Sequence, residues 1–189
     1  MLADPGANLK KVFEDVKHEI NRGALESKHP FRYVVFNTYS KSIATRYVVL
    51  RKIDHALNLL IYTDSRSRKV EQIKLDNQVQ LLFYHPKKKC QVIVQGKATV
   101  HHQDEVSKKH WKNVQGQGKR AYAPTIAPGK TIQEPKEAFE WDYDVDDKYF
   151  TVISLAPFEI EMLQLNGSEH LRARFTQSED DWNKQWIAP

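Results

Sequence analysis

Side chains between Cys90 and His101 alternate in character, and this alternation constrains the fold more than any other feature. One face of the segment carries Cys, Val, Gly and Ala, and the other face is mostly polar. A period of two is typical of a β-strand that buries one of its faces. Gly96 lies on the apolar face, which predicts a bulge or a close approach of another backbone. The framework of the protein is therefore predicted to be a sheet with one covered face.

Short segments rich in Val, Ile, Tyr, Phe and Thr recur along the rest of the chain and are separated by polar turns. They predict strands at 31–39, 43–53, 57–63, 79–84, 149–155, 158–165, 170–176 and 182–187. Ala156-Pro157 is expected to break the fifth of these from the sixth, and Asn166-Gly167 is typical of a hairpin turn. Three helices are predicted at 7–25, 67–76 and 104–114, the last with Asp104 as its N-cap. The pattern favours a single domain over residues 1–189 that is mainly β, an antiparallel barrel with α additions.

The segment 115–147 differs from the rest because it contains Gly, Pro and acidic residues without sustained periodicity. A long irregular segment inside a domain is often a binding loop, a lid or a disordered insert. We therefore predict an irregular insert here and expect part of it to be mobile.

Composition excludes several classes of protein. The formal net charge is +5, but the basic residues are spread along the chain, which favours a small anion over nucleic acid as the partner. The apolar runs are too short to span a membrane, and the first residues do not resemble a signal peptide. A single cysteine, Cys90, excludes an internal disulfide framework. These features predict a cytoplasmic protein without a membrane partner.

The stretch from Arg46 to Lys69 contains the strongest indication of a binding site. Two strand-like runs lead into a polar turn, where Ser67 is placed to cap a helix and Arg66, Arg68 and Lys69 crowd its first turn. The free N–H groups of a helix start favour an anion, and added cations strengthen that preference. We predict a phosphate site here. The alternative is an ordinary exposed turn rich in basic residues.

Other reactive side chains show no catalytic or metal-binding arrangement in the sequence. There is no Ser-His-Asp order, no paired Cys motif and no metal-ligand spacing. His101 and His102 are adjacent in a predicted strand, so their side chains point to opposite faces and cannot easily chelate together. Cys90 is predicted to be a buried, unreactive thiol. We therefore predict no metal and name no general base.

Several motifs resemble the pyridoxamine 5′-phosphate oxidase family, in the same order and spacing. They are Arg46-Tyr-Val-Val-Leu-Arg51, Tyr62-Thr63, Ser67-Arg68-Lys69, Gln91-Val-Ile-Val-Gln-Gly-Lys-Ala98 and the closing segment with Arg174-Phe175 and Trp182 to Pro189. The resemblance covers about residues 31–114 and 149–189. It implies an FMN-binding split β-barrel of Greek-key type, a homodimer that holds FMN at the subunit interface. It also implies FMN-contacting or pocket-lining roles for Arg46, Arg51, Tyr62, Thr63, Ser67, Arg68, Lys69, Gln91 and Arg174.

The motifs for the vitamin B6 substrate depart from the family pattern. Leu165 stands where the family has a Trp beside the flavin, and Leu171-Arg172-Ala173 replaces an Arg-x-His motif. Lys109 and Asn113 replace a Tyr and an Arg of the substrate-phosphate site. Lys109 and Arg172 are the remaining candidates for binding an anionic substrate.

The resemblance therefore predicts an FMN-dependent oxidoreductase that acts on a small substrate such as a phosphorylated amine or alcohol. Three alternatives remain from the sequence. They are a genuine pyridoxamine or pyridoxine 5′-phosphate oxidase, a flavin-binding protein without turnover, and an anion- or nucleic-acid-binding barrel without flavin.

Overall fold

Antiparallel strands build one continuous sheet in the computed structural model, which describes residues 1–141, 145–179 and 181–189. The strands are β1 (Tyr33–Tyr39), β2 (Ile43–Ile53), β3 (Leu59–Asp64), β4 (Gln78–His85), β5 (Cys90–His102), β6 (Phe150–Gln164), β7 (Leu171–Gln177) and β8 (Trp182–Ile187). The α-helices are α1 (Leu9–Leu25), α2 (Arg68–Leu75) and α3 (Glu105–Lys112). Short 3-10 helices occur at η1 (Pro30–Arg32), η2 (Gly116–Tyr122) and η3 (Pro135–Phe139). The predicted helices and most predicted strands are confirmed to within two or three residues.

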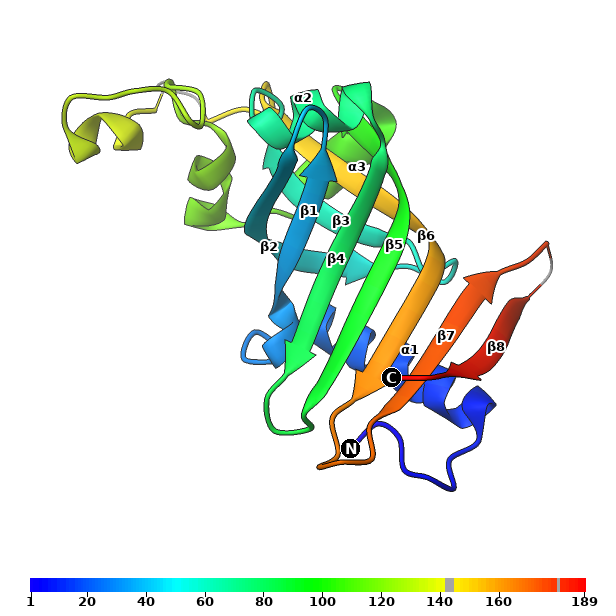
Figure 1. The fold of residues 1–189 in the computed structure, drawn as a ribbon. Helices are drawn as coiled ribbons and strands as arrows, with labels where there is room; N and C mark the ends of the chain where they lie inside the picture. The colour runs from blue at the N-terminus through cyan, green and yellow to red at the C-terminus, as the bar shows by residue number, and fades with distance from the viewer. Residues whose placement is uncertain (142–144, 180) are drawn as a thin grey trace.

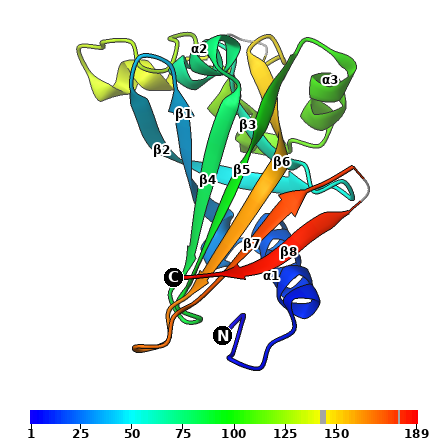
Figure 2. The same cartoon turned by 45° about the vertical axis from the view of Figure 1, so that its right-hand side comes forward.

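The sheet closes on itself as a barrel. Its strand order is β3-β2-β1-β4-β5-β6, and an additional pairing of β3 with β6 completes a ring of six strands. Because β4 returns beside β1 after three consecutive strands, the arrangement is a Greek key. β7 and β8 continue from β6 outside the ring and form a flap at one side (Figure 1, Figure 2). The predicted mainly β antiparallel barrel of Greek-key type is confirmed.

The predicted break at Ala156-Pro157 is wrong, because β6 runs without interruption from Phe150 to Gln164. Its first part pairs with β3 up to Leu155, and its last part pairs with β7 from Glu159 onward. Between these two parts β6 has a ladder partner only in β5. The missing N–H of a proline is tolerated where a strand has an unpaired side. Pro157 therefore marks a change of neighbour along the strand and does not end it.

Gly96 explains how the strand bends at that point. The pairing of β5 with β6 shifts register between Gln95 and Gly96, which is the bulge that the sequence predicted. A Cβ atom on Gly96 would collide with the backbone carbonyl oxygen of Ala156. A glycine is therefore required by the close approach of the two backbones.

Helices close both ends of the barrel. α2 lies across one end, where β3 leads into it, and α1 packs toward the opposite end, near both chain termini (Figure 1). Val12, Val16 and Ile20 follow one another at four-residue spacing on α1, and all three are buried in the main core. Asp104 caps α3 as predicted, with a capping box to Ser107. No described helix has the length and apolar character needed to cross a membrane.

The first part of the predicted irregular insert packs against the barrel. Tyr122, at the end of η2, is buried in a second hydrophobic cluster with Leu60, Phe150 and Val152. Beyond it the segment with η3 projects from the α2 end of the barrel (Figure 1). Residues 142–144 of the predicted insert lie outside the described residues.

Candidate functional site

The start of α2 has the backbone geometry of an anion site. Ser67 has the extended conformation of an N-cap, as predicted, but its side chain makes no capping hydrogen bond. Its buried hydroxyl lies instead 3.3 Å from the hydroxyl of Thr63. The N–H groups of the first turn are therefore left without a side-chain cap, and such groups favour an anion.

Three cations, Arg46, Arg68 and Lys69, surround this helix start, and we call them the cation cluster. Lys69 donates to the hydroxyl of Thr63 over 2.9 Å. Burial and then the charge of Arg46 lower the pKa of Lys69, and burial followed by the charge of Arg68 lowers the pKa of Arg46. The charged forms of Lys69 and Arg46 are therefore destabilised by their surroundings, as expected where an anion is to be bound.

Nearby carboxylates do not neutralise the cation cluster. Asp64 is the carboxylate whose charge acts on Lys69, but both of its oxygens accept hydrogen bonds from Arg66. In the described part of the chain no carboxylate lies within 4.0 Å of a charged nitrogen of the cluster. The excess positive charge fits a phosphate, which accepts charge-assisted hydrogen bonds.

Gln72 provides a further donor at the same place. Its side-chain oxygen accepts from Thr38 over 2.7 Å and from Arg46 over 3.0 Å. Since an arginine can only donate, this contact identifies the oxygen, and the amide nitrogen is left buried without a partner. An orphaned buried donor beside three cations fits the acceptor oxygens of a phosphate.

Arg66, which the sequence placed in the same crowded turn, has a different role. Its guanidinium binds Asp64 and donates to the carbonyl oxygens of Pro124 and Thr125 over 2.6 and 3.0 Å. It also stacks on Tyr149, with 3.4 Å between the guanidinium carbon and the ring centroid. Arg66 therefore anchors the insert and is not part of the cation cluster.

Arg51 and Tyr62 form a second group on the other side of the barrel wall. Tyr62 directly precedes Thr63 on β3, so their side chains face opposite sides of the sheet. The hydroxyl of Tyr62 lies 2.7 Å from Nδ1 of His110, and Arg51 donates to the hydroxyl of Tyr122 over 2.8 Å. Burial raises the pKa of Tyr62 and lowers the pKa of His110. We call these four side chains the aromatic cluster.

Gln91, Arg172 and Arg174 form a third group on the outward face of the sheet. Gln91 and Arg172 both pair with Leu163, and Arg174 pairs with Glu161. Leu163 therefore lies between Gln91 and Arg172 in the sheet. Leu165, which stands where the family has a Trp, lies beyond the end of β6.

The third group is far from the cation cluster within one chain. Thr63 pairs with Thr151 on β6, and Arg174 pairs with Glu161 on the same strand. Ten residues of strand separate these two levels, which is roughly 33 Å along β6. The structure therefore brings Arg46, Thr63, Ser67, Arg68 and Lys69 together, but it separates them from Gln91 and Arg174.

Three residues of these groups, His110, Gln72 and Tyr122, were not predicted as site residues from the sequence. Lys109 is exposed on α3, whereas its neighbour His110 is buried and contacts Tyr62. Gln72 has a signal that could have been recognised, because it lies one helical turn after Arg68 and shares its side of α2. Tyr122 had no local signal, since its contacts come from strands far away in the sequence.

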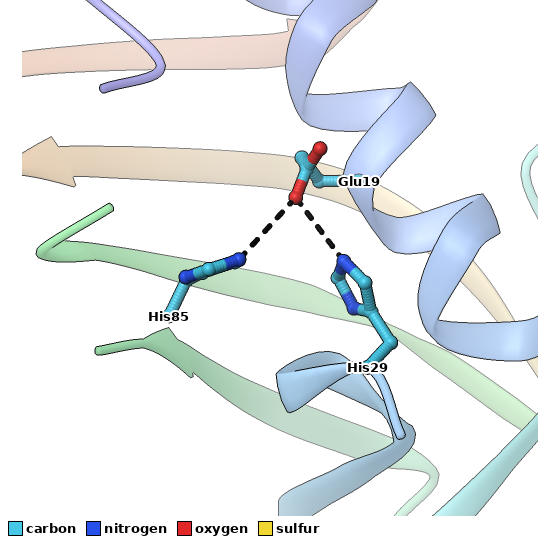
Figure 3. A group of neighbouring side chains, drawn as sticks. All are labelled: Glu19, His29 and His85. Atoms are coloured by element: carbon cyan, nitrogen blue, oxygen red, sulfur yellow. Dashed lines mark hydrogen bonds and ion pairs between the residues drawn. The ribbon is translucent and has the colours of Figure 1, made fainter. Parts of the chain in front are cut away.

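A separate buried cluster joins Glu19, His29 and His85 (Figure 3). Nε2 of His29 and Nε2 of His85 lie 3.2 and 3.8 Å from one carboxylate oxygen of Glu19. Lys88 and Arg22 bind its other oxygen over 2.6 and 3.1 Å. Lys88 is therefore part of an ion pair with a buried carboxylate.

The tautomers of the two histidines argue against a metal at this cluster. Nδ1 of His29 accepts from the backbone N–H of Phe31, and Nδ1 of His85 accepts from that of Lys88. The proton of each neutral ring is therefore on Nε2 and faces Glu19. A metal at Nε2 would need the lone pair there and would break both backbone hydrogen bonds. The cluster is better explained as an ion-pair network that ties α1 to the β4–β5 turn.

Comparisons with known proteins agree with the geometry. Residues 10–102 match the family described as pyridoxamine 5′-phosphate oxidase, FMN-binding domain. A pyridoxamine 5′-phosphate oxidase-related FMN-binding protein of Nostoc punctiforme PCC 73102 superposes with a TM-score of 0.78 at 20% identity, covering 93% of this chain and 96% of that one. PhzG of Burkholderia lata 383, solved with tetrahydrophenazine-1-carboxylic acid, superposes with a TM-score of 0.74 at 18% identity, covering 100% and 96%. No curated protein sequence matches the chain significantly. The matching family is described by its FMN-binding domain, and the cation cluster fits the phosphate of that cofactor.

Proposed function

We propose that this chain, a divergent member of the pyridoxamine 5′-phosphate oxidase-related family of FMN-binding split barrels, is an FMN-dependent oxidoreductase acting on a small molecule. The observation that carries the proposal is the uncompensated cation cluster at the uncapped start of α2. When bound, FMN would supply the redox chemistry by accepting a hydride equivalent from the substrate. The protein would supply the position of the flavin and the charges around it.

Each residue of the α2 end has a distinct part in holding FMN under this proposal. Lys69 and Arg46 would bind the phosphate from two sides, with the amide nitrogen of Gln72 as a neutral donor. The exposed Arg68 would complete the charge, and the hydroxyls of Thr63 and Ser67 are available as further donors. Tyr62 and Arg51 would lie behind this strand and support the pocket from the aromatic cluster.

A homodimer is part of the proposal because one chain cannot bring all the predicted FMN residues to one flavin. FMN is much shorter than the roughly 33 Å of strand between the level of Thr63 and that of Arg174. A second copy could place its Gln91 and Arg174 against the first copy's cation cluster, and a twofold axis would then create two equal sites. Exposed aromatic side chains on the outer sheet surface support such an interface, with Tyr33, Tyr47 and Tyr84 at least half exposed.

The substrate is proposed only as a small molecule. Lys109 is exposed on α3, and its ammonium group has no hydrogen-bond or ion-pair partner among the described residues that would direct it to a substrate. Arg172 is held in an ion pair with Glu161. The family's B6 substrate therefore has no clear counterpart site among these two candidates. The single, buried cysteine is consistent with a cytoplasmic location.

The visible absorption spectrum of the purified full-length protein tests the proposal. We expect a flavin spectrum, either as purified or after addition of FMN, and the mass of FMN for the released cofactor. Turnover is then assayed with pyridoxamine and pyridoxine 5′-phosphate and with reduced nicotinamides as reductants. A protein that gains no flavin absorbance in excess FMN would refute the proposal. FMN binding without reduction by any of these compounds would support a flavin-binding role without turnover.

A further inference from the structure

Glu161 is a buried carboxylate between two arginines on the outward face of the sheet. It lies on β6, is 7% exposed, and pairs across the sheet with Ile93 on one side and Arg174 on the other. Arg172 and Arg174 are both on β7, two residues apart, so both guanidinium groups reach the same carboxylate. A carboxylate this buried needs such partners.

The two arginines are held very unequally. Arg172 donates from Nε over 2.9 Å and from Nη2 over 2.5 Å to one oxygen of Glu161. Arg174 makes one long contact, 3.4 Å from Nη2 to the other oxygen. Nε of Arg174 is buried without a hydrogen-bond partner. Arg172 is therefore fixed by its ion pair, whereas Arg174 keeps donors that remain to be used.

Glu159 does not replace Glu161 in this role. One of its oxygens accepts a hydrogen bond from Gln95 on β5 over 2.8 Å, on the side away from β7. Its other oxygen is 3.6 Å from Nε of Arg174, which is an ion pair but too long for a hydrogen bond. Glu159 contributes charge near Arg174, and Glu161 determines where the two guanidinium groups lie.

We propose that Glu161 is a positioning residue for FMN. It fixes Arg172 through their ion pair and orients Arg174 so that the guanidinium N–H groups not facing Glu161 or Glu159 can donate to an acceptor atom of FMN. This inference rests on the proposed function, in which Arg174 of one copy faces the flavin bound at the other copy's cation cluster. It also assigns Arg172 to the support of the site, so that this arginine is not a substrate ligand.

FMN binding by the full-length Glu161→Gln variant tests the inference, because the amide keeps the shape but loses the charge. We expect the Kd for FMN to rise about tenfold, with a similar rise for Arg174→Ala. The double variant should be no weaker than Arg174→Ala alone, since Glu161 acts through Arg174. Glu159→Gln is the matched control, because it removes the same charge from the same face, and its Kd should stay within about threefold of the wild type.

The midpoint potential of the bound flavin separates positioning from a simple field effect. A cation near the flavin stabilises the reduced form, so misplacing Arg174 should lower the potential in Glu161→Gln as it does in Arg174→Ala. If Glu161 acted only through its negative charge, its removal would raise the potential. A raised potential, additive losses in the double variant or an equal loss in Glu159→Gln would overturn the inference.

A second variant is needed in case Glu161→Gln fails to fold because Arg172 and Arg174 are left facing each other without a carboxylate between them. Glu161→Gln combined with Arg172→Gln removes one charge of each sign, and it should show the same weaker FMN binding and lowered potential. If the wild type binds no FMN, the proposed function itself fails. If the wild type binds FMN and Arg174→Ala binds it equally well, only the role of Glu161 fails.

Discussion

Replacing Lys69 by methionine should separate a phosphate ligand from a structural lysine, because the two roles predict opposite effects on the apoprotein. Lys69 is largely buried beside Arg46, and its hydrogen bond goes to Thr63, whose hydroxyl can still pair with Ser67. Removing a buried cation that repels neighbouring cations leaves the free energy of unfolding unchanged or raises it. We expect the free energy of unfolding of the apoprotein to stay equal or to rise by up to about 1 kcal/mol.

FMN binding by the same variant should weaken strongly. One charge-assisted hydrogen bond is worth about 1.5–3 kcal/mol, which corresponds to a roughly ten- to hundredfold rise in Kd. Quenching of flavin fluorescence measures Kd, and urea unfolding measures stability. Lys74→Met is the control, since Lys74 is exposed in the last turn of the same helix. A Kd within twofold of the wild type, or a clear loss of stability in the apoprotein, would refute the phosphate role of Lys69.

The pH dependence of apoprotein stability and of FMN affinity gives an independent test of the role of Lys69. The pKa of Lys69 is lowered from 10.5, first by burial and then by Arg46, so the unfolded chain binds this proton more tightly than the folded one. Over the pH range below 10.5 in which the folded lysine loses its proton, apoprotein stability should rise with pH. FMN affinity should fall over the same range, because the phosphate loses a cation. Both trends should be absent in Lys69→Met.

Four further predictions concern the rest of the fold. Glu19→Gln should lower stability by about 2–4 kcal/mol, because it leaves the buried partners of the carboxylate uncompensated. In the wild type, burial lowers the pKa of His85. Burial raises the pKa of Glu19, but Lys88 and Arg22 outweigh this effect and lower it. Urea titrations should therefore show a loss of stability as the pH falls below 6.5 and a further loss below 4.5. Gly96→Ala should cost about 2–3 kcal/mol in urea unfolding, because its Cβ has no room, whereas Gly118→Ala has room and should be neutral. Tyr122→Phe should cost about 1–3 kcal/mol, since Arg51 loses its partner, and unchanged thermal unfolding would contradict that contact.

Local chemistry was enough to predict the elements and the cofactor class. The period of two at Cys90–His102, the N-caps Ser67 and Asp104 and the turn at Asn166-Gly167 all depend on neighbouring residues, and the structure has them as expected. The motifs from Arg46 to Lys69 predicted the resemblance to an FMN-binding family for the same reason, and the family model matches residues 10–102. Strand β3 leads directly into α2, so Thr63, Ser67, Arg68 and Lys69 meet through a local connection, and Arg46 joins them from β2.

Pairing between distant strands decided what the sequence could not. Pro157 was expected to end a strand because its missing N–H is a local defect, yet the exchange of β3 for β7 along β6 leaves that position paired with β5 alone. Arg66 resembled its neighbours Arg68 and Lys69 in the sequence, but Asp64 and the insert turn it away.

The separation of Arg174 from the cation cluster follows from the same physics. Its place is set by the register of β7 on β6, and that register depends on which faces are buried across the whole sheet. Glu161 is buried between two arginines only because three strands meet in this register. The sequence by itself predicted FMN as the cofactor and the residues that could bind it. Tertiary structure alone decided which of those residues share one site, because hydrogen-bonded ladders join residues that no local pattern connects.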